Sequence, residues 1–197
     1  MQLTDLPPAD ALFSDRVALA DVARRVGRSD LPRLLDEIFD ALDAALAGAG
    51  DAEVVFVPDD PKATDSEEGR GWTVGHIVAH VTAGLEETSA AASTLARGVE
   101  MTGRPRYEVP WETLTSAEAV RRRLAESRRM CRAFLETWPD EPHLENTYTP
   151  FPSLGPLNGP MRLLLSLGHA RGHLPHLAEV LHQAQVSGVP TESSAVA

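Results

Sequence analysis

Residues 31–46 read LPRLLDEIFDALDAAL, and their apolar side chains recur at the spacing of a helix. The i, i+3, i+4 pattern is typical of an amphipathic helix that buries one face. Ser29 or Asp30 is expected to cap the start of this helix, and Gly48 is expected to end it. Because such a face needs other helices to cover it, the segment predicts a helical bundle. The apolar stripe comprises Leu34, Leu35, Ile38, Leu42 and Leu46.

Helical signals continue on both sides of this segment. A shorter helix is expected at residues 14–26, and long helices are expected from 74 to about 97 and from 160 to about 184. Thr115 and Glu118 form a T-x-x-E capping box for another helix, which is expected to end near Trp138. The chain therefore predicts an all-α four-helix bundle with an extra N-terminal helix and long interhelical loops. We expect one domain over residues 1–197, with a frayed tail at 187–197.

Composition narrows the class of protein. The 197 residues carry a net charge of -11, and 43% of them are hydrophobic, which is typical of a soluble globular chain. Cys131 is the only cysteine, which excludes an internal disulfide and favours a cytoplasmic location. No apolar stretch is long enough to span a membrane, so no membrane partner is expected. The acidic excess argues against nucleic acid as a partner.

One segment, residues 121–132, departs from this acidic balance because it is rich in arginine. Its arginines are expected to form a solvated helix face, and the alternative is a surface for an acidic partner. The chain contains no G-x-G-x-x-G, Walker, G-x-S-x-G or H-E-x-x-H motif, so nucleotide-dependent chemistry and serine hydrolysis have no support. The segment carries Arg121, Arg122, Arg123, Arg128, Arg129 and Arg132.

Five of the seven histidines gather in two segments that are expected to be helical. These segments read WTVGHIVAH at residues 72–80 and HARGHLPH at residues 169–176. Both contain H-x-x-x-H, a spacing that places two imidazoles on one face of a helix, where they can share a metal ion.

The angular positions of these histidines separate them. At 100° per residue, His169, His173 and His176 form one stripe beside a stripe of leucines. His80 lies at the flank of its own apolar stripe, whereas His76 lies nearly opposite and is expected to be solvent-exposed. The bundle interior can then receive His80 together with two histidines of the last helix. Three nitrogen ligands with an open position are usual for a catalytic metal site. The alternative is that each histidine is a hydrogen-bonded core or surface residue.

Further candidate residues lie near these segments. Glu87 shares the face of His80 and is a candidate proton acceptor or a partner of a metal ligand, or else a surface carboxylate. Arg162 shares the stripe of His169 and is a candidate ligand for a substrate carboxylate, or else a solvent-facing arginine. Cys131 is expected to be a structural thiol. Four aromatic residues are expected to line a pocket or to pack the loops onto the bundle: Trp111, Trp138, Tyr148 and Phe151.

The order of these motifs resembles the DinB/YfiT-like family, whose members are four-helix bundles with a histidine triad. Trp72 to His80 matches the family's Trp-Ser/Thr-x-x-x-[apolar]-x-x-His segment, and His169 with His173 matches its H-x-x-x-H. The resemblance covers roughly residues 30–186, the expected family core. It implies that His80, His169 and His173 bind one divalent metal ion, which is zinc, nickel or iron.

Two residues depart from the family pattern. Many members place Gly-Gln shortly after the last histidine, where this chain has Pro175 and His176. Pro175 lacks a backbone donor and is expected to kink the helix, or to begin a new first turn. His176 is expected to hydrogen-bond near the site or to replace a ligand.

The resemblance implies a metal-dependent transferase, isomerase or hydrolase. Its metal would activate a small thiol or water against a small-molecule substrate, with a low-molecular-weight thiol as cosubstrate and a homodimer as the assembly. Glu87, Arg162 and His176 are the candidate catalytic residues. The alternative is a non-catalytic dimeric helical bundle, a binding or stress-related module whose metal site has degenerated.

Overall fold

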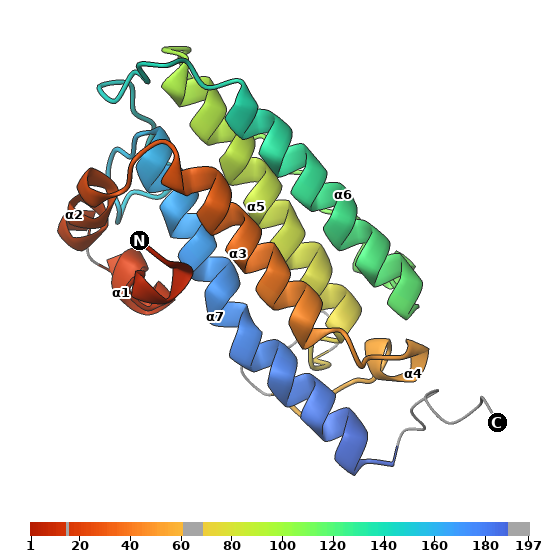
Figure 1. The fold of residues 1–197 in the computed structure, drawn as a ribbon. Coiled ribbons are helices and arrows are strands. Elements are labelled where there is room, and N and C mark those ends of the chain that lie inside the picture. Colours follow the sequence, from red (N-terminus) through yellow and green to blue (C-terminus); the bar gives the residue numbers. More distant parts are fainter. Residues whose placement is uncertain (15, 61–68, 189–197) are drawn as a thin grey trace.

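A computed structural model describes residues 1–14, 16–60 and 69–188 of the chain (Figure 1). Within these ranges it contains seven α-helices, two short 3-10 helices and no strand, which confirms the all-helical prediction. Tyr148 and Leu157 form an isolated bridge. The elements are η1 (Leu3–Asp5), α1 (Ala9–Ser14), α2 (Arg16–Arg25), α3 (Asp30–Ala45), α4 (Asp51–Val54), α5 (Val74–Ala96), η2 (Trp111–Thr113), α6 (Ala117–Glu136) and α7 (Gly159–Val186).

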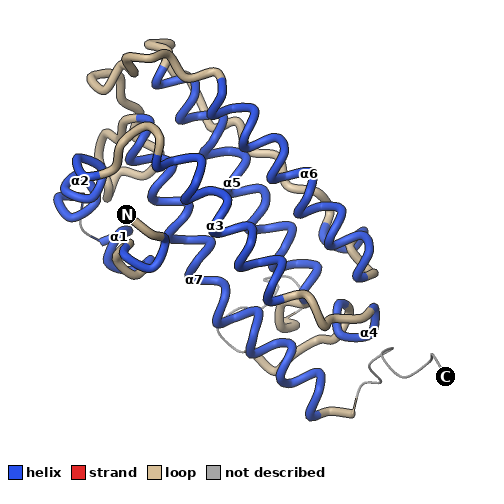
Figure 2. Tube along the Cα trace, viewed as in Figure 1, coloured by secondary structure: helices blue, strands red, loops and turns tan. Residues whose placement is uncertain are grey.

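Four long helices, α3, α5, α6 and α7, run side by side as a bundle (Figures 1 and 2). Helix α5 packs against both α6 and α7, and α3 also packs against both of them. The short helices α1 and α2 lie against α7. They replace the single N-terminal helix that was expected at 14–26, since helical structure begins as early as Ala9. Most of the expected tail, residues 189–197, lies outside the described residues.

Hydrophobic burial explains why α3 takes its place in the bundle. Four residues of its predicted stripe, Leu34, Leu35, Ile38 and Leu42, have no exposed surface, and Leu46 is 2% exposed. Burial of each such side chain contributes about 1.5–3 kcal/mol relative to exposure. The i, i+3, i+4 pattern therefore identifies the buried face of α3 correctly.

Side-chain caps fix where the long helices begin. Thr73 accepts a hydrogen bond from the backbone N–H of His76, so α5 starts where the sequence predicts. Helix α6 is capped by Ser116, whose hydroxyl accepts from the N–H of Ala119, and the predicted capping box at Thr115 is wrong by one residue. Asp51 accepts the N–H of Ala117, which helps to hold the first turn at this register.

Helix α7 continues through Pro175 as one helical element, so the expected new first turn at this residue is not seen. A proline at this position cannot donate to the carbonyl of Arg171. Near this point, the Arg171 side chain donates to the carbonyls of Leu3 and Leu6, which ties α7 to the N-terminal segment.

The arginines of α6 form only partly the solvated face that the sequence predicts. Arg128 and Arg132 both donate to Asp36 on α3. Arg123 is buried and pairs with Glu86 of α5. These arginines stabilise the packing of α6 against its neighbours. Because they are paired within the chain, they are not available to an acidic partner, the alternative that the sequence left open. Each helix among the described residues is either too short or too polar to span a membrane.

Candidate metal centre

Three histidines meet between α5 and α7. His80 comes from the second turn of α5, and His169 and His173 lie one turn apart on α7. His169 Nε2 lies 3.5 Å from His80 Nε2 and 3.2 Å from His173 Nε2. Within the described ranges, these three residues form the one group of histidine, cysteine or acidic side chains that is close enough to hold a metal ion.

The spacing of the three nitrogens fits a single metal ion. Nitrogen ligands bind a metal such as zinc at about 2.0–2.1 Å, so two of them at a tetrahedral angle are about 3.4 Å apart. The two Nε2–Nε2 distances bracket this value. All the ligand atoms lie within 4.8 Å of one another, so the three histidines can hold a metal ion.

Burial keeps the three imidazoles in the form that binds metals. Burial and the neighbouring His169 lower the pKa of His80 to about 4. Burial and the other histidines lower the pKa of His173 to about 3. The pKa of His169 is also lowered, by burial and by the charge of Arg106. At neutral pH all three rings are therefore neutral, with a lone pair available to a cation.

Two of these rings have acidic groups or another imidazole on their Nδ1 side. His173 Nδ1 lies 3.5 Å from His176 Nδ1, and His176 Nε2 lies 2.9 Å from Asp60 Oδ2. On α5, His80 Nδ1 lies 3.9 Å from Glu108 Oε1. Partners on the nitrogen that does not bind the metal usually fix the orientation and tautomer of a ligand histidine.

The other histidine of α5 is not solvent-exposed, contrary to the sequence prediction. His76 is half-buried in a stack of rings, with its centroid 4.3 Å from Trp72 and 5.0 Å from Trp111. Trp72 continues the stack toward the triad, 5.0 Å from His80 and 6.2 Å from His173. The face analysis fails here because the loop that carries Trp111 covers this side of α5.

Residues 34–177, nearly three quarters of the chain, match the DinB superfamily, and the matched range contains His80, His169 and His173. The chain belongs to the DinB superfamily. Neither the search of curated proteins nor the search of solved structures gave a match.

Beyond the triad, this DinB protein buries an ion-pair cluster between α5 and α7. Glu87 is 2% exposed and Arg162 is 1% exposed, so both surface alternatives of the sequence analysis are wrong. Arg162 Nη2 donates to Glu87 at 3.1 Å, and Arg104 donates to both of its carboxylate oxygens, at 2.7 and 2.8 Å. Arg106 Nη1 lies 3.5 Å from Glu87 and its Nη2 lies 2.5 Å from Glu108.

The charges of this cluster oppose the effect of burial on Glu87. Burial alone would raise the pKa of Glu87, but the hydrogen bond from Arg104 and the neighbouring guanidinium charges hold that pKa below its usual value. Burial lowers the pKa of Arg162, against the opposing effect of Glu87. Glu87 is therefore an ionised structural partner of arginines, which makes it a poor proton acceptor.

A pocket of about 400 Å³ connects the cluster with the triad. His80 and His169 lie on its wall together with Arg106 and Arg162. Phe151 also lines it, as the sequence analysis allowed, and Arg104 stacks on the Phe151 ring at 4.9 Å. The candidate metal centre of this DinB protein is thus open to a small molecule on one side.

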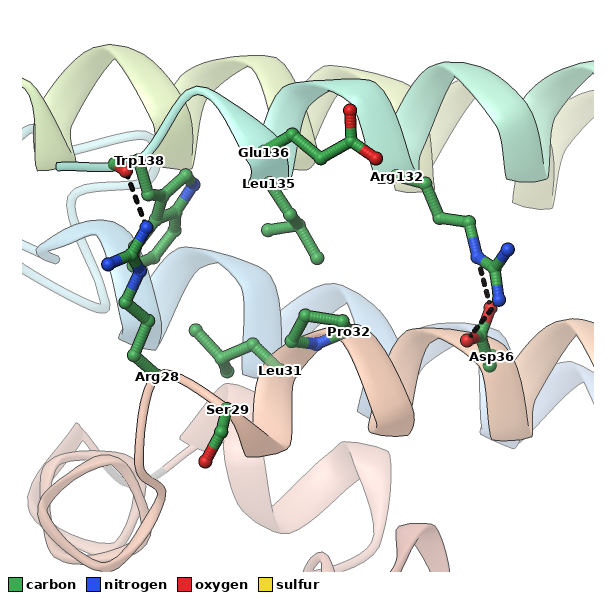
Figure 3. A pocket seen from close by; sticks show the side chains of 9 residues that line it. All are labelled: Arg28, Ser29, Leu31, Pro32, Asp36, Arg132, Leu135, Glu136 and Trp138. Carbon is green, nitrogen blue, oxygen red and sulfur yellow. Dashed lines mark hydrogen bonds and ion pairs between the residues drawn. The ribbon is translucent and has the colours of Figure 1, made fainter. Parts of the chain in front are cut away.

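A larger cavity of about 720 Å³ lies elsewhere, between α3 and α6 (Figure 3). Leu31 and Pro32 face Leu135 across it, and the Arg132–Asp36 ion pair lies at one end. Trp138 lies at the other end, where its carbonyl accepts from Arg28. Because no histidine lines this cavity, it has no part in the candidate metal centre.

Cys131 is a buried free thiol within α6. Burial raises the pKa of this thiol to about 12, so it stays protonated at neutral pH. A protonated, inaccessible thiol is not a nucleophile.

Four residues of the site were missed from the sequence. Arg104, Arg106 and Glu108 follow one another at every second position of the 97–110 loop, and Asp60 lies in a polar loop before α5. Alternate side chains of an extended segment point to the same side, so the spacing of the first three was a usable signal. No comparable signal marks Asp60.

Proposed function

We propose that this DinB protein is a metal-dependent enzyme in which His80, His169 and His173 hold one divalent ion. The convergence of three neutral imidazoles at 3.2 and 3.5 Å carries the proposal. A divalent ion supplies Lewis acidity, which lowers the pKa of a thiol or of water and so provides a nucleophile at neutral pH. The pocket beside the triad supports an enzyme, because a purely structural metal site is usually closed by protein ligands.

His176 acts in this proposal as a positioning residue. If His173 binds the ion through Nε2, its proton lies on Nδ1 and is donated to His176 Nδ1. The remaining proton of His176 then lies on Nε2, which is 2.9 Å from Asp60 Oδ2, within ion-pair distance but without hydrogen-bond geometry. The hydrogen bond between His173 and His176 thus favours the tautomer that His173 needs as a ligand, and Asp60 adds a negative charge beside His176.

Glu87 and Arg162 are proposed to shape the pocket. Their burial and their mutual hydrogen bond hold α5 and α7 together beside the triad. Glu87 also fixes Arg104, and through it the loop that covers the pocket.

Cobalt substitution tests whether a small thiol reaches the ion. Cobalt(II)-loaded protein should show a thiolate-to-cobalt charge-transfer band when glutathione is added, and His169→Ala should show none. A d–d spectrum that responds to pH but not to glutathione would favour water over a thiol. Failure of the wild-type protein to retain cobalt would instead favour the non-catalytic bundle.

The family resemblance also leads us to propose a homodimer. Light scattering on the purified protein should then give twice the chain mass of 21.2 kDa. A mass equal to that of one chain would overturn this part of the proposal.

A further inference from the structure

We infer that the pocket beside the triad is a subsite for a small organic anion, a carboxylate attached to a short apolar group. The inference rests on the proposed function for one point only, namely that the other end of the molecule faces a metal ion. The anion site itself is argued from the residues that line the pocket.

The charge of the pocket favours an anion. Its lining includes three arginines and two glutamates, so the guanidinium groups exceed the carboxylates by one. This excess is unusual in a chain whose net charge is -11. An unmatched guanidinium in a partly enclosed pocket attracts a carboxylate and can bind it through two parallel hydrogen bonds. The five charged residues are Arg104, Arg106, Arg162, Glu87 and Glu108.

A buried donor at this pocket is left without a partner. Arg162 is 1% exposed, and its Nε has no hydrogen-bond partner among the described residues. A buried donor that stays unsatisfied costs about 1–3 kcal/mol, so such a group usually marks a place where a ligand or water binds. The hydrogen bond from Arg162 to Glu87 uses Nη2, so the Nε–H group remains available to an anion.

The shape of the pocket places this anion next to the triad. A Cβ atom on Gly84 would lie 3.8 Å from Arg106 Nη1 and 3.9 Å from His169 Nδ1. The guanidinium and the imidazole therefore flank the same small space, which the absence of a side chain at Gly84 keeps open. Phe13, Phe151 and Leu165 supply the apolar part of the wall.

Benzoate and its neutral analogue benzamide are suitable probes. Titration of the protein in chelator, followed by NMR, should show benzoate binding at least tenfold more tightly than benzamide. Benzoate should shift the arginine Nε–H resonance that is lost in Arg162→Lys. Arg106→Gln should weaken benzoate binding at least tenfold, whereas Arg122→Gln, at an exposed arginine of α6, should leave it unchanged.

The outcomes separate this inference from the proposed function. Since the titration is made without metal, the anion subsite is tested even if the chain binds no ion. Equal binding of benzoate and benzamide would overturn the inference, and so would the absence of benzoate binding. Benzoate binding that appears only after zinc is added and is unaffected by Arg106→Gln would also overturn it, because the carboxylate would then bind at the ion. Melting curves and metal content of Arg106→Gln confirm that this variant is folded.

Discussion

His176 stands at the point where this chain departs from the family pattern, and its contacts support the positioning role that we propose for it. It links His173 to Asp60 through distances of 3.5 and 2.9 Å. Single residues of this kind decide how well the three imidazoles are oriented, since a ligand that is free to rotate must lose that freedom on binding an ion.

Removal of this link should weaken metal binding without abolishing it. His176→Phe keeps an aromatic ring but neither nitrogen, so we expect a 10–100-fold loss of zinc affinity in a competition titration. His182→Phe, at an exposed histidine of the same helix, is the matched control and should bind zinc as the wild type does. Equal affinity in His176→Phe would show that His173 is oriented by its packing alone.

Glu87 matters at the same scale for stability. Glu87→Gln leaves the buried guanidinium of Arg162 without its anionic partner, so urea unfolding should show a loss of about 3–5 kcal/mol. Glu118→Gln, which removes an exposed partner of Arg122, should change the free energy of unfolding by less than about 0.5 kcal/mol.

A second variant makes the reason for this loss testable. Glu87→Gln combined with Arg162→Met replaces the broken pair by an apolar side chain and should recover part of the stability. If the loss of unfolding free energy in the double variant equals the sum of the losses in the two single variants, Glu87 and Arg162 do not pair specifically.

At the scale of elements, α5 is the helix on which the site depends. It packs against α6, α7 and the 3-10 turn η2 that carries Trp111. The close approach of η2 requires a glycine, because a Cβ on Gly75 would lie 2.4 Å from the carbonyl oxygen of Leu114.

Gly75→Ala should therefore push η2 away from α5. We expect a loss of about 1–3 kcal/mol in the free energy of unfolding, together with a change in tryptophan fluorescence as Trp111 leaves His76. Gly48→Ala, where a Cβ would meet no atom within 4 Å, should be neutral or slightly stabilising. Unchanged fluorescence and stability in Gly75→Ala would mean that the contact between η2 and α5 is loose.

The sequence predicts elements best where one helix carries the whole signal. The stripe of α3, the cap at Thr73 and the two H-x-x-x-H motifs follow from local spacing, and the structure brings His80, His169 and His173 together. The spacing of Arg104, Arg106 and Glu108 indicates a shared side of their loop but not that this side meets the triad, and no spacing marks Asp60. The exposure of His76 was mispredicted because a distant segment covers it.

For the whole molecule, the half-buried neutral histidines couple stability to pH. Their native pKa values lie near 4 for His80 and near 3 for His173, below the ordinary value of 6.5. Below pH 6.5 the unfolded chain binds protons that the native chain does not, so stability in chelator should fall as the pH is lowered. Each such histidine contributes up to about 1.4 kcal/mol per pH unit.

Unfolding of the chelated protein between about pH 6.5 and pH 5 measures this slope. His173→Gln should have a shallower slope by up to one proton, and His182→Gln should keep the wild-type slope. Equal slopes in wild type and His173→Gln would show that His173 is protonated in the native protein over this range.

Metal content shows whether three histidines from two helices hold one ion. Elemental analysis should be made on tag-free protein that was loaded with zinc and then desalted, for the wild type, His173→Ala and His182→Ala. We expect one equivalent of metal in the wild type and in His182→Ala, and a loss of that metal in His173→Ala. Equal metal content in His173→Ala, or none in the wild type, would contradict this expectation.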